Sequence, residues 1–271
     1  MTRTLSLPTL NWVRFATEDE GVPVGTQPLA RLCAAARDGG FGAIGVDAFT
    51  LARPDSPPDR VGELLAEYGL ACTDVGVLAV GTVDCRDSAA RLAAVAGAAG
   101  ARRCLTVLNA PATRAVIRDL KDCAEILAEA GVSLALEFLH YGQVTSLAQA
   151  ADLCAEVGWD QCGILLDTWH FFTTGTPWDE LSALEGRHVA LVHANDAVVP
   201  ARADLQYESR FRRLPPGRGD FDLPQFFAAL DGIGYDGVVS AEVLSAELLT
   251  RDPTEVASLV WASLDGYEVA S

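Results

Sequence analysis

The fold of this chain is decided by two stretches, GILLD at Gly163–Asp167 and VALVHA at Val189–Ala194. Both are short apolar runs rather than alternations of apolar and polar residues. A strand has this continuous pattern when both of its faces are buried, as in a parallel sheet covered by helices. The two stretches therefore predict parallel strands, each joined to the next by a helix.

The same pattern of short strand and amphipathic helix recurs along the whole chain. The eight predicted strands are Leu5–Asn11, Ala43–Asp47, Ala71–Leu78, Cys104–Leu108, Ser133–Phe138, Gly163–Asp167, Val189–Ala194 and Val238–Val243. We expect helices over Pro28–Asp38, Asp59–Tyr68, Ser88–Ala99, Arg114–Ala130, Ser146–Val157 and Leu223–Ile233, with Ser88 and Ser146 as N-caps. These repeats predict an α/β fold, a single (β/α)8 TIM barrel over residues 1–271. A doubly wound open sheet is the alternative, but no glycine-rich dinucleotide fingerprint follows the first strand.

The composition narrows the class of ligand. A formal net charge of −17 repels nucleic acid and anionic membranes. No apolar run reaches the roughly 18 residues of a membrane span, and Met1–Trp12 lacks the pattern of a signal peptide. Seven cysteines without a CxxC pair are typical of a reduced protein. We therefore expect a cytoplasmic protein that binds a small molecule.

Four consecutive predicted strands end in a side chain that can bind a metal ion, namely Glu137, Asp167, His193 and Glu242. The carboxyl ends of barrel strands converge on one mouth, so we expect the four side chains to meet there. A carboxylate at a strand end can also simply cap the next helix. Clustered carboxylates repel one another, however, and a dication relieves that repulsion. The donor set favours one divalent ion, Mn²⁺ before Mg²⁺ or Co²⁺, and is also compatible with Zn²⁺.

His170 follows Asp167 by three residues, in a position to contact a substrate oxygen. The alternative is a structural histidine packed among neighbouring aromatic side chains. The early strands and this segment also supply residues expected to line a mixed polar and aromatic pocket: Asn11, Trp12, Asp47, Asn109, Trp169 and Phe172.

The segment at about 196–222 is long for a loop and rich in arginine. Its arginines are Arg202, Arg210, Arg212, Arg213 and Arg218. Long loops in compact domains are often lids or binding loops, although a solvated excursion is the alternative.

These motifs form a recognisable ordered set: LEF at Leu136–Phe138, LDTWHF at Leu166–Phe171, HAND at His193–Asp196, PGRGDFD at Pro216–Asp222 and VSAEV at Val239–Val243. The set resembles the xylose-isomerase-like sugar phosphate isomerase/epimerase superfamily, and most of all its 2-keto-myo-inositol (inosose) isomerase branch. The resemblance implies that the four strand-end residues are the metal ligands and that both glutamates also act as acid/base groups. It further implies that His170 contacts substrate and that Arg202 or Arg218 anchors it.

The same superfamily contains three-zinc DNA repair nucleases of the endonuclease IV type, and this chain departs from them. Phe211 and Arg213 stand where those nucleases place an aspartate and a histidine, and the chain has only four histidines. Together with the net charge, this makes DNA cleavage the disfavoured activity.

The predicted function is isomerisation or epimerisation of a keto-sugar or keto-inositol through a metal-bound enediolate. A dehydratase acting on an inosose or on 3-dehydroshikimate is the first alternative, because the same intermediate can expel a β-hydroxyl. A non-catalytic barrel subunit or binding module is the second. The expected partner is a small polyhydroxy keto substrate, with a homodimer left open.

Overall fold

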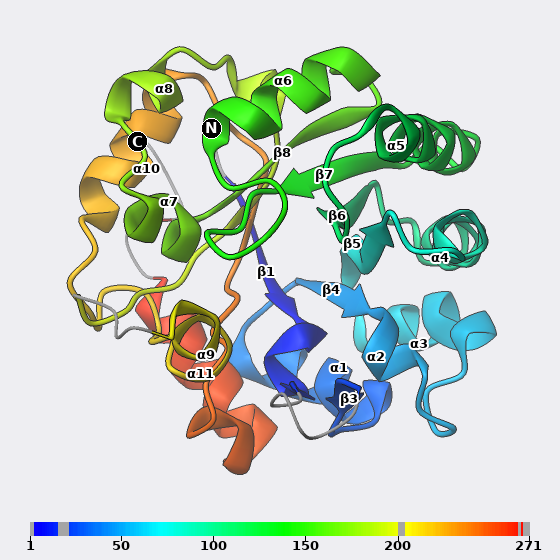
Figure 1. Ribbon diagram of the computed structural model, residues 1–271. Helices are drawn as coiled ribbons and strands as arrows, with labels where there is room; N and C mark the ends of the chain where they lie inside the picture. The colour runs from blue at the N-terminus through cyan, green and yellow to red at the C-terminus, as the bar shows by residue number, and fades with distance from the viewer. Residues whose placement is uncertain (1–2, 16–21, 200–203, 265–266, 268–271) are drawn as a thin grey trace.

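Eight parallel strands close into a barrel in the computed structural model, which describes residues 3–15, 22–199, 204–264 and 267 (Figure 1). The strands are β1 (Thr4–Pro8), β4 (Ala43–Asp47), β5 (Ala71–Val80), β6 (Arg103–Leu108), β7 (Ser133–Glu137), β8 (Cys162–Asp167), β9 (Val189–His193) and β10 (Val238–Ser240). Strand β1 pairs with both β4 and β10, which closes the ring. The predicted (β/α)8 barrel is confirmed, and the open sheet is wrong. The single-domain organisation over residues 1–271 stays a prediction.

Helices surround the barrel (Figure 1). They are α1 (Leu29–Gly39), α2 (Ala48–Leu51), α3 (Val61–Tyr68), α4 (Cys85–Ala99), α5 (Arg114–Ala128), α6 (Leu147–Val157), α7 (Thr168–Thr174), α8 (Trp178–Ser182), α9 (Leu205–Phe211), α10 (Leu223–Gly232) and α11 (Pro253–Ser263). The first and last of these pack closely, because a Cβ on Gly39 would lie 2.6 Å from the Cβ of Ala257. A short antiparallel pair, β2 (Val13–Arg14) and β3 (Val24–Gly25), lies outside the barrel sheet.

The alternation of side chains along the strands determines which strand-end residues point into the barrel. Leu105, Ala135, Leu165 and Leu191 belong to an apolar cluster built from strand residues alone, which fills the interior of the barrel. Side chains two residues further along a strand point to the same side. Glu137, Asp167 and His193 therefore also point inward, one layer nearer the carboxyl ends of the strands.

One of the two predicted helix caps is confirmed. The Ser146 side chain accepts a hydrogen bond from Gln149 N at the start of α6. The N-cap predicted at Ser88 is wrong, because α4 already begins at Cys85. The backbone N–H of Ser88 donates to the Asp84 carbonyl at 2.9 Å, so Ser88 lies inside the first turn of the helix.

The arginine-rich segment is not a loop throughout, because it contains α9. An isolated bridge between Asp196 and Leu214 joins the two ends of the segment, and a second bridge between Arg212 and Ser245 ties it to the chain that follows β10. The interpretation as a purely solvated excursion is therefore wrong. Arg202 lies outside the described residues.

All seven cysteines are buried and unpaired. Burial raises the pKa of several of these thiols, including that of Cys33 to about 12. Among the described helices, none has the length and hydropathy needed to cross a membrane.

Candidate metal centre

Four buried side chains meet at the carboxyl ends of adjacent strands. Glu137 ends β7, Asp167 ends β8, His193 ends β9, and Glu242 lies two residues beyond the end of β10. One potential ligand atom from each lies within 4.8 Å of the others. The convergence expected from the strand ends is therefore present in the fold.

The backbone around these residues is held by specific side-chain contacts. Asp167 caps α7, because its Oδ1 accepts from Trp169 N at 2.7 Å and from Asn195 Nδ2 at 2.9 Å. The capping role weighed from the sequence is thus real, but it uses only one of the two carboxylate oxygens. Oδ2 remains directed to the cluster.

Glu242 is positioned by Asn11, which sequence analysis placed in the pocket wall. Asn11 Nδ2 donates to the Ala241 carbonyl at 2.9 Å, and Asn11 Oδ1 accepts from Val243 N at 2.7 Å. The side chain can reach both groups because β1 ends at Pro8, earlier than predicted, and residues Thr9–Trp12 form a 3-10 turn. The two bonds bracket the peptide unit that carries Glu242.

Arg213 is a member of the site that was not predicted from the sequence. Its side chain is 2% exposed, and Nη1 donates to Asp167 Oδ2 at 2.6 Å and to Glu242 Oε2 at 2.9 Å. Nε and Nη2 donate to the carbonyl and hydroxyl of Ser209. No strand or helix periodicity in the sequence marks this arginine as facing the cluster.

The titratable groups of the cluster differ in pKa, because burial and neighbouring charges act on each of them differently. Burial, reinforced by Glu242 and Asp167, raises the pKa of Glu137 to about 8. Burial also opposes ionisation of Asp167, but Arg213 and the nearby histidines hold its pKa at about 2. The neighbouring carboxylates outweigh the effect of burial on His193 and raise its pKa to about 9. Without a bound dication, the site therefore holds protons on Glu137 and His193 at neutral pH.

His170 lies beside the cluster as a neutral imidazole. Burial lowers its pKa to about 3, so its approach to Glu137, 4.0 Å from Nε2 to Oε1, is not an ion pair. Both of its ring nitrogens are buried without a hydrogen-bond partner among the described residues. Tyr141 and Trp169 pack edge-on against the ring. The aromatic packing weighed in the sequence is thus present, and it leaves the nitrogens free for a ligand.

The donor set fits a divalent cation. Both nitrogens of His193 are buried without a hydrogen-bond partner in the described part of the chain, and the carboxylates around the ring repel one another. A dication would satisfy the nitrogen that faces it and relieve the repulsion. Oxygen donors from three carboxylates with one imidazole suit Mn²⁺, Mg²⁺, Co²⁺ or Zn²⁺.

The remaining predicted residues are less closely tied to the cluster. Trp169 is buried under the Arg213 guanidinium, at 5.9 Å. Asn109 follows β6 and is exposed, and Arg218 is exposed with its backbone N–H on Pro215. Of the other pocket candidates, Trp12 and Asp47 are buried, and Phe172 stacks on Phe221.

The segment around α9 lies against one side of the cluster, which was not predicted from the sequence. The Arg210 guanidinium lies 5.5 Å from the ring centre of Phe15 and 6.0 Å from that of Tyr141. Tyr141 also hydrogen-bonds Ser209 through its hydroxyl, at 3.1 Å. These contacts place α9 beside His170 and Arg213.

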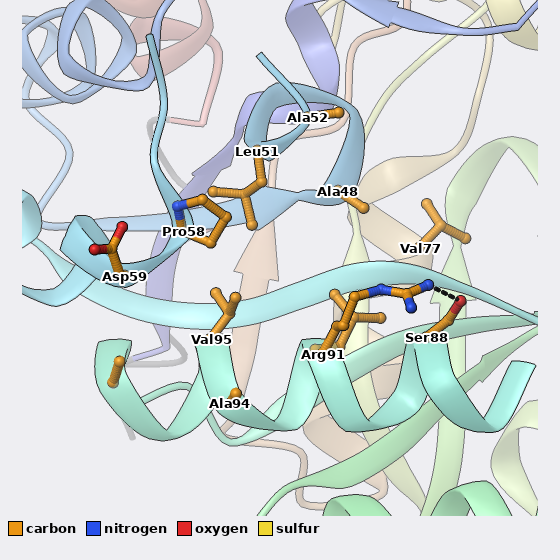
Figure 2. A pocket seen from close by; sticks show the side chains of 12 residues that line it. Ala48, Leu51, Ala52, Pro58, Asp59, Val77, Ser88, Arg91, Ala94 and Val95 are labelled. Atoms are coloured by element: carbon orange, nitrogen blue, oxygen red, sulfur yellow. Dashed lines mark hydrogen bonds between the residues drawn. The ribbon is translucent and has the colours of Figure 1, made fainter. Parts of the chain in front are cut away.

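A separate pocket of about 560 Å³ opens between α2 and α4 (Figure 2). Its wall is mostly apolar, with Arg91 donating to Ser88 Oγ at one side. None of the four cluster residues lines this pocket. It is therefore distinct from the candidate metal centre.

A closed barrel of parallel strands with a buried Glu/Asp/His/Glu cluster at its mouth defines a class of (β/α)8 proteins with a potential metal centre. The chain belongs to the xylose isomerase-like TIM barrel family, whose model matches residues 33–260. The family predicted from the motifs is confirmed.

Similar proteins come from several branches. An inosose isomerase of Bacillus velezensis is 34% identical over 143 residues, covering 51% of this chain and 49% of that protein. A 3-dehydroshikimate dehydratase of Pseudomonas aeruginosa is 33% identical over 128 residues, 47% of this chain and 20% of that protein. The matches thus span about half the length of the inosose isomerases. The crystal structure of the IOLI protein with a zinc atom has a TM-score of 0.79 at 18% identity, with 98% of both chains covered, and shows the shared fold.

Proposed function

We propose that this protein is a divalent-metal-dependent isomerase or epimerase of a keto-sugar or keto-inositol. The observation that carries the proposal is the group of four potential ligand atoms within 4.8 Å, set beside a neutral buried His170. The similarity to inosose isomerases supports the same class of substrate. The negative net charge of the chain suits an uncharged polyhydroxy compound.

When bound, a divalent ion would polarise the substrate carbonyl and acidify the adjacent C–H bond. Glu137 is assigned the proton transfer because its carboxylate lies within the cluster at which the substrate carbonyl would bind. Glu242 enters from β10, three strands around the ring from β7, and so can approach a planar substrate anion from another side. A proton returned to the neighbouring carbon gives an isomer, and one returned to the opposite face of the same carbon gives an epimer.

His170 and Arg213 would orient the substrate. The neutral imidazole can donate to one substrate oxygen and accept from another, since neither of its nitrogens has a hydrogen-bond partner among the residues that the structure describes. The guanidinium carries a permanent charge toward the cluster and would stabilise negative charge that develops on a substrate oxygen. Arg202 and Arg218 stay sequence-based proposals as substrate anchors.

Substitution of the two glutamates tests the proposed acid/base roles. Glu137→Gln and Glu242→Gln should each lower exchange of the substrate C–H with solvent deuterium by about 100-fold or more. The matched control is Glu185→Gln, at an exposed glutamate paired with Arg187, which should retain full exchange. Retention of exchange by both active-site variants would contradict the assigned roles.

A dehydratase is the second candidate, favoured by the similarity to 3-dehydroshikimate dehydratases. The same proton removal followed by loss of a β-hydroxyl would give an unsaturated product. Mass spectrometry of products from keto-inositols, ketohexoses and 3-dehydroshikimate separates the two, because only dehydration changes the mass.

A non-catalytic role is opposed by the complete donor set, since a binding module need not keep four convergent ligands. Elemental analysis of the purified protein tests this, with one Mn²⁺ or Zn²⁺ per chain expected. We propose Mn²⁺ from the oxygen-rich donors, while the related IOLI structure carries zinc. Cytoplasmic location and a homodimer stay predictions.

A further inference from the structure

A buried carboxylate with no part in the proposed chemistry lies in the barrel interior, on β5. Asp74 is 4% exposed, and its Oδ1 accepts a hydrogen bond from Thr73 Oγ1 at 2.7 Å. The Thr73 hydroxyl is 2.8 Å from Ser6 Oγ. Gly45 makes room for this carboxylate, because a Cβ there would lie 2.7 Å from Asp74 Oδ2. A buried carboxyl group is costly unless its oxygens have hydrogen-bond partners.

A small cavity joins this carboxylate to the metal centre. It has a volume of about 10 Å³ and is lined by Asp47, Asp74, His193 and Glu242 among other residues. A polar cavity needs roughly 10–15 Å³ to hold one water molecule. The cavity, which Asp74 and His193 both line together with several apolar residues, therefore has room for about one water molecule.

If Nδ1 of His193 binds the ion, its second ring nitrogen still needs a hydrogen-bond partner. Its Nδ1 lies 3.2 Å from Glu242 Oε1 and 3.9 Å from Asp167 Oδ2, so this nitrogen faces the cluster. Nε2, on the other side of the ring, is buried and has no hydrogen-bond partner among the described residues. Metal-binding histidines usually donate their second N–H to a carboxylate, carbonyl or water, which fixes the tautomer and the ring orientation.

We propose that Asp74 is a positioning residue for the metal centre and acts through one water in this cavity. His193 Nε2–H donates to the water, and the water donates to the Asp74 carboxylate. The arrangement holds Nδ1 of His193 toward the ion and strengthens it as a ligand. The inference rests on the proposed metal-dependent function.

Zinc affinity of the full-length protein tests the proposal, measured by competition with a chromophoric chelator. Asp74→Asn should bind Zn²⁺ about 10- to 100-fold more weakly than the wild type. Asp47→Asn is the matched control, because Asp47 is equally buried in the same cavity wall but already accepts from Thr9 and Thr50. The control should bind within about threefold of the wild type, since Asn can still cap the helix.

Different results of this experiment contradict the role of Asp74 and the proposed metal-dependent function. A wild-type protein without stoichiometric zinc binding overturns the proposed function. Two results overturn only the role of Asp74. In the first, the wild type binds zinc and Asp74→Asn binds it with an affinity within threefold of the wild type. In the second, Asp47→Asn loses as much zinc affinity as Asp74→Asn.

Nitrogen-15 NMR of histidine-labelled protein gives a second readout that does not depend on a variant folding. The chain has four histidines, so the ring signals can be assigned individually. In the zinc-loaded wild type, His193 should bind through Nδ1 and carry a proton on Nε2 that exchanges slowly with solvent. Half-buried His188 serves as the internal reference. Zinc bound through Nε2, or exchange as fast as at His188, overturns the proposal.

Discussion

Replacing Arg213 by methionine should destabilise the metal-free protein far more than the zinc-loaded protein. The guanidinium is buried and donates to Asp167 at 2.6 Å and to Glu242 at 2.9 Å. Methionine keeps much of the side-chain volume but leaves both carboxylates buried without this cation. Removing one partner of a buried ion pair costs about 3–5 kcal/mol. At about 2–4 °C per kcal/mol, the Tm of the metal-free protein should fall by roughly 6–20 °C.

Bound zinc supplies positive charge to the same carboxylates, so saturating zinc should restore most of the lost stability in Arg213→Met. Calorimetric melts of the metal-free and zinc-loaded forms measure both effects. The control is Arg212→Met, at an exposed neighbour whose Nε lies 3.4 Å from Glu208, with an expected change within about 0.5 kcal/mol. An equal loss with and without zinc would refute the view that Arg213 is a counter-charge for the metal ligands.

Three further outcomes follow from the geometry. Zinc affinity should rise with pH up to about 9. Glu137 and His193, with pKa values of about 8 and 9, bind protons below those values, and these protons compete with the ion. Calorimetry at pH 7 in buffers of different ionisation enthalpy should show proton release on zinc binding, and the absence of release contradicts the assignment. Asn11→Ala should cost about 1–3 kcal/mol in urea unfolding and lower turnover by loosening Glu242, whereas unchanged stability would rule out the clamp. Ser146→Ala should cost about 1 kcal/mol through the lost helix cap, with metal affinity unchanged; a changed affinity would show that the cap reaches the site.

The local pattern of the sequence was sufficient for the barrel. Continuous apolar runs such as Gly163–Asp167 predicted strands buried on both faces, and the structure has a strand at each predicted place. Boundaries were less certain, because capping depends on where the chain leaves the preceding strand. Ser146 caps α6 as predicted, whereas α4 starts before Ser88.

The candidate site was only partly predictable. Glu137, Asp167, His193 and Glu242 could be found because each follows a strand, and a barrel brings all strand ends to one mouth. Arg213 could not be found this way, because it follows a helix within an irregular segment. The composition of the segment, with its several arginines, does not say which of them turns inward, and the structure places Arg213 there.

The sequence by itself determined the features that follow from its periodic pattern, namely the order of strands and helices and the residues near which the strands end. Only the tertiary structure decided which groups lose water and which charges face one another, as for the neutral imidazole of His170 and the protonated carboxyl of Glu137. The physical reason is that periodicity is a property of neighbouring residues, whereas desolvation and charge pairing depend on side chains far apart in the chain.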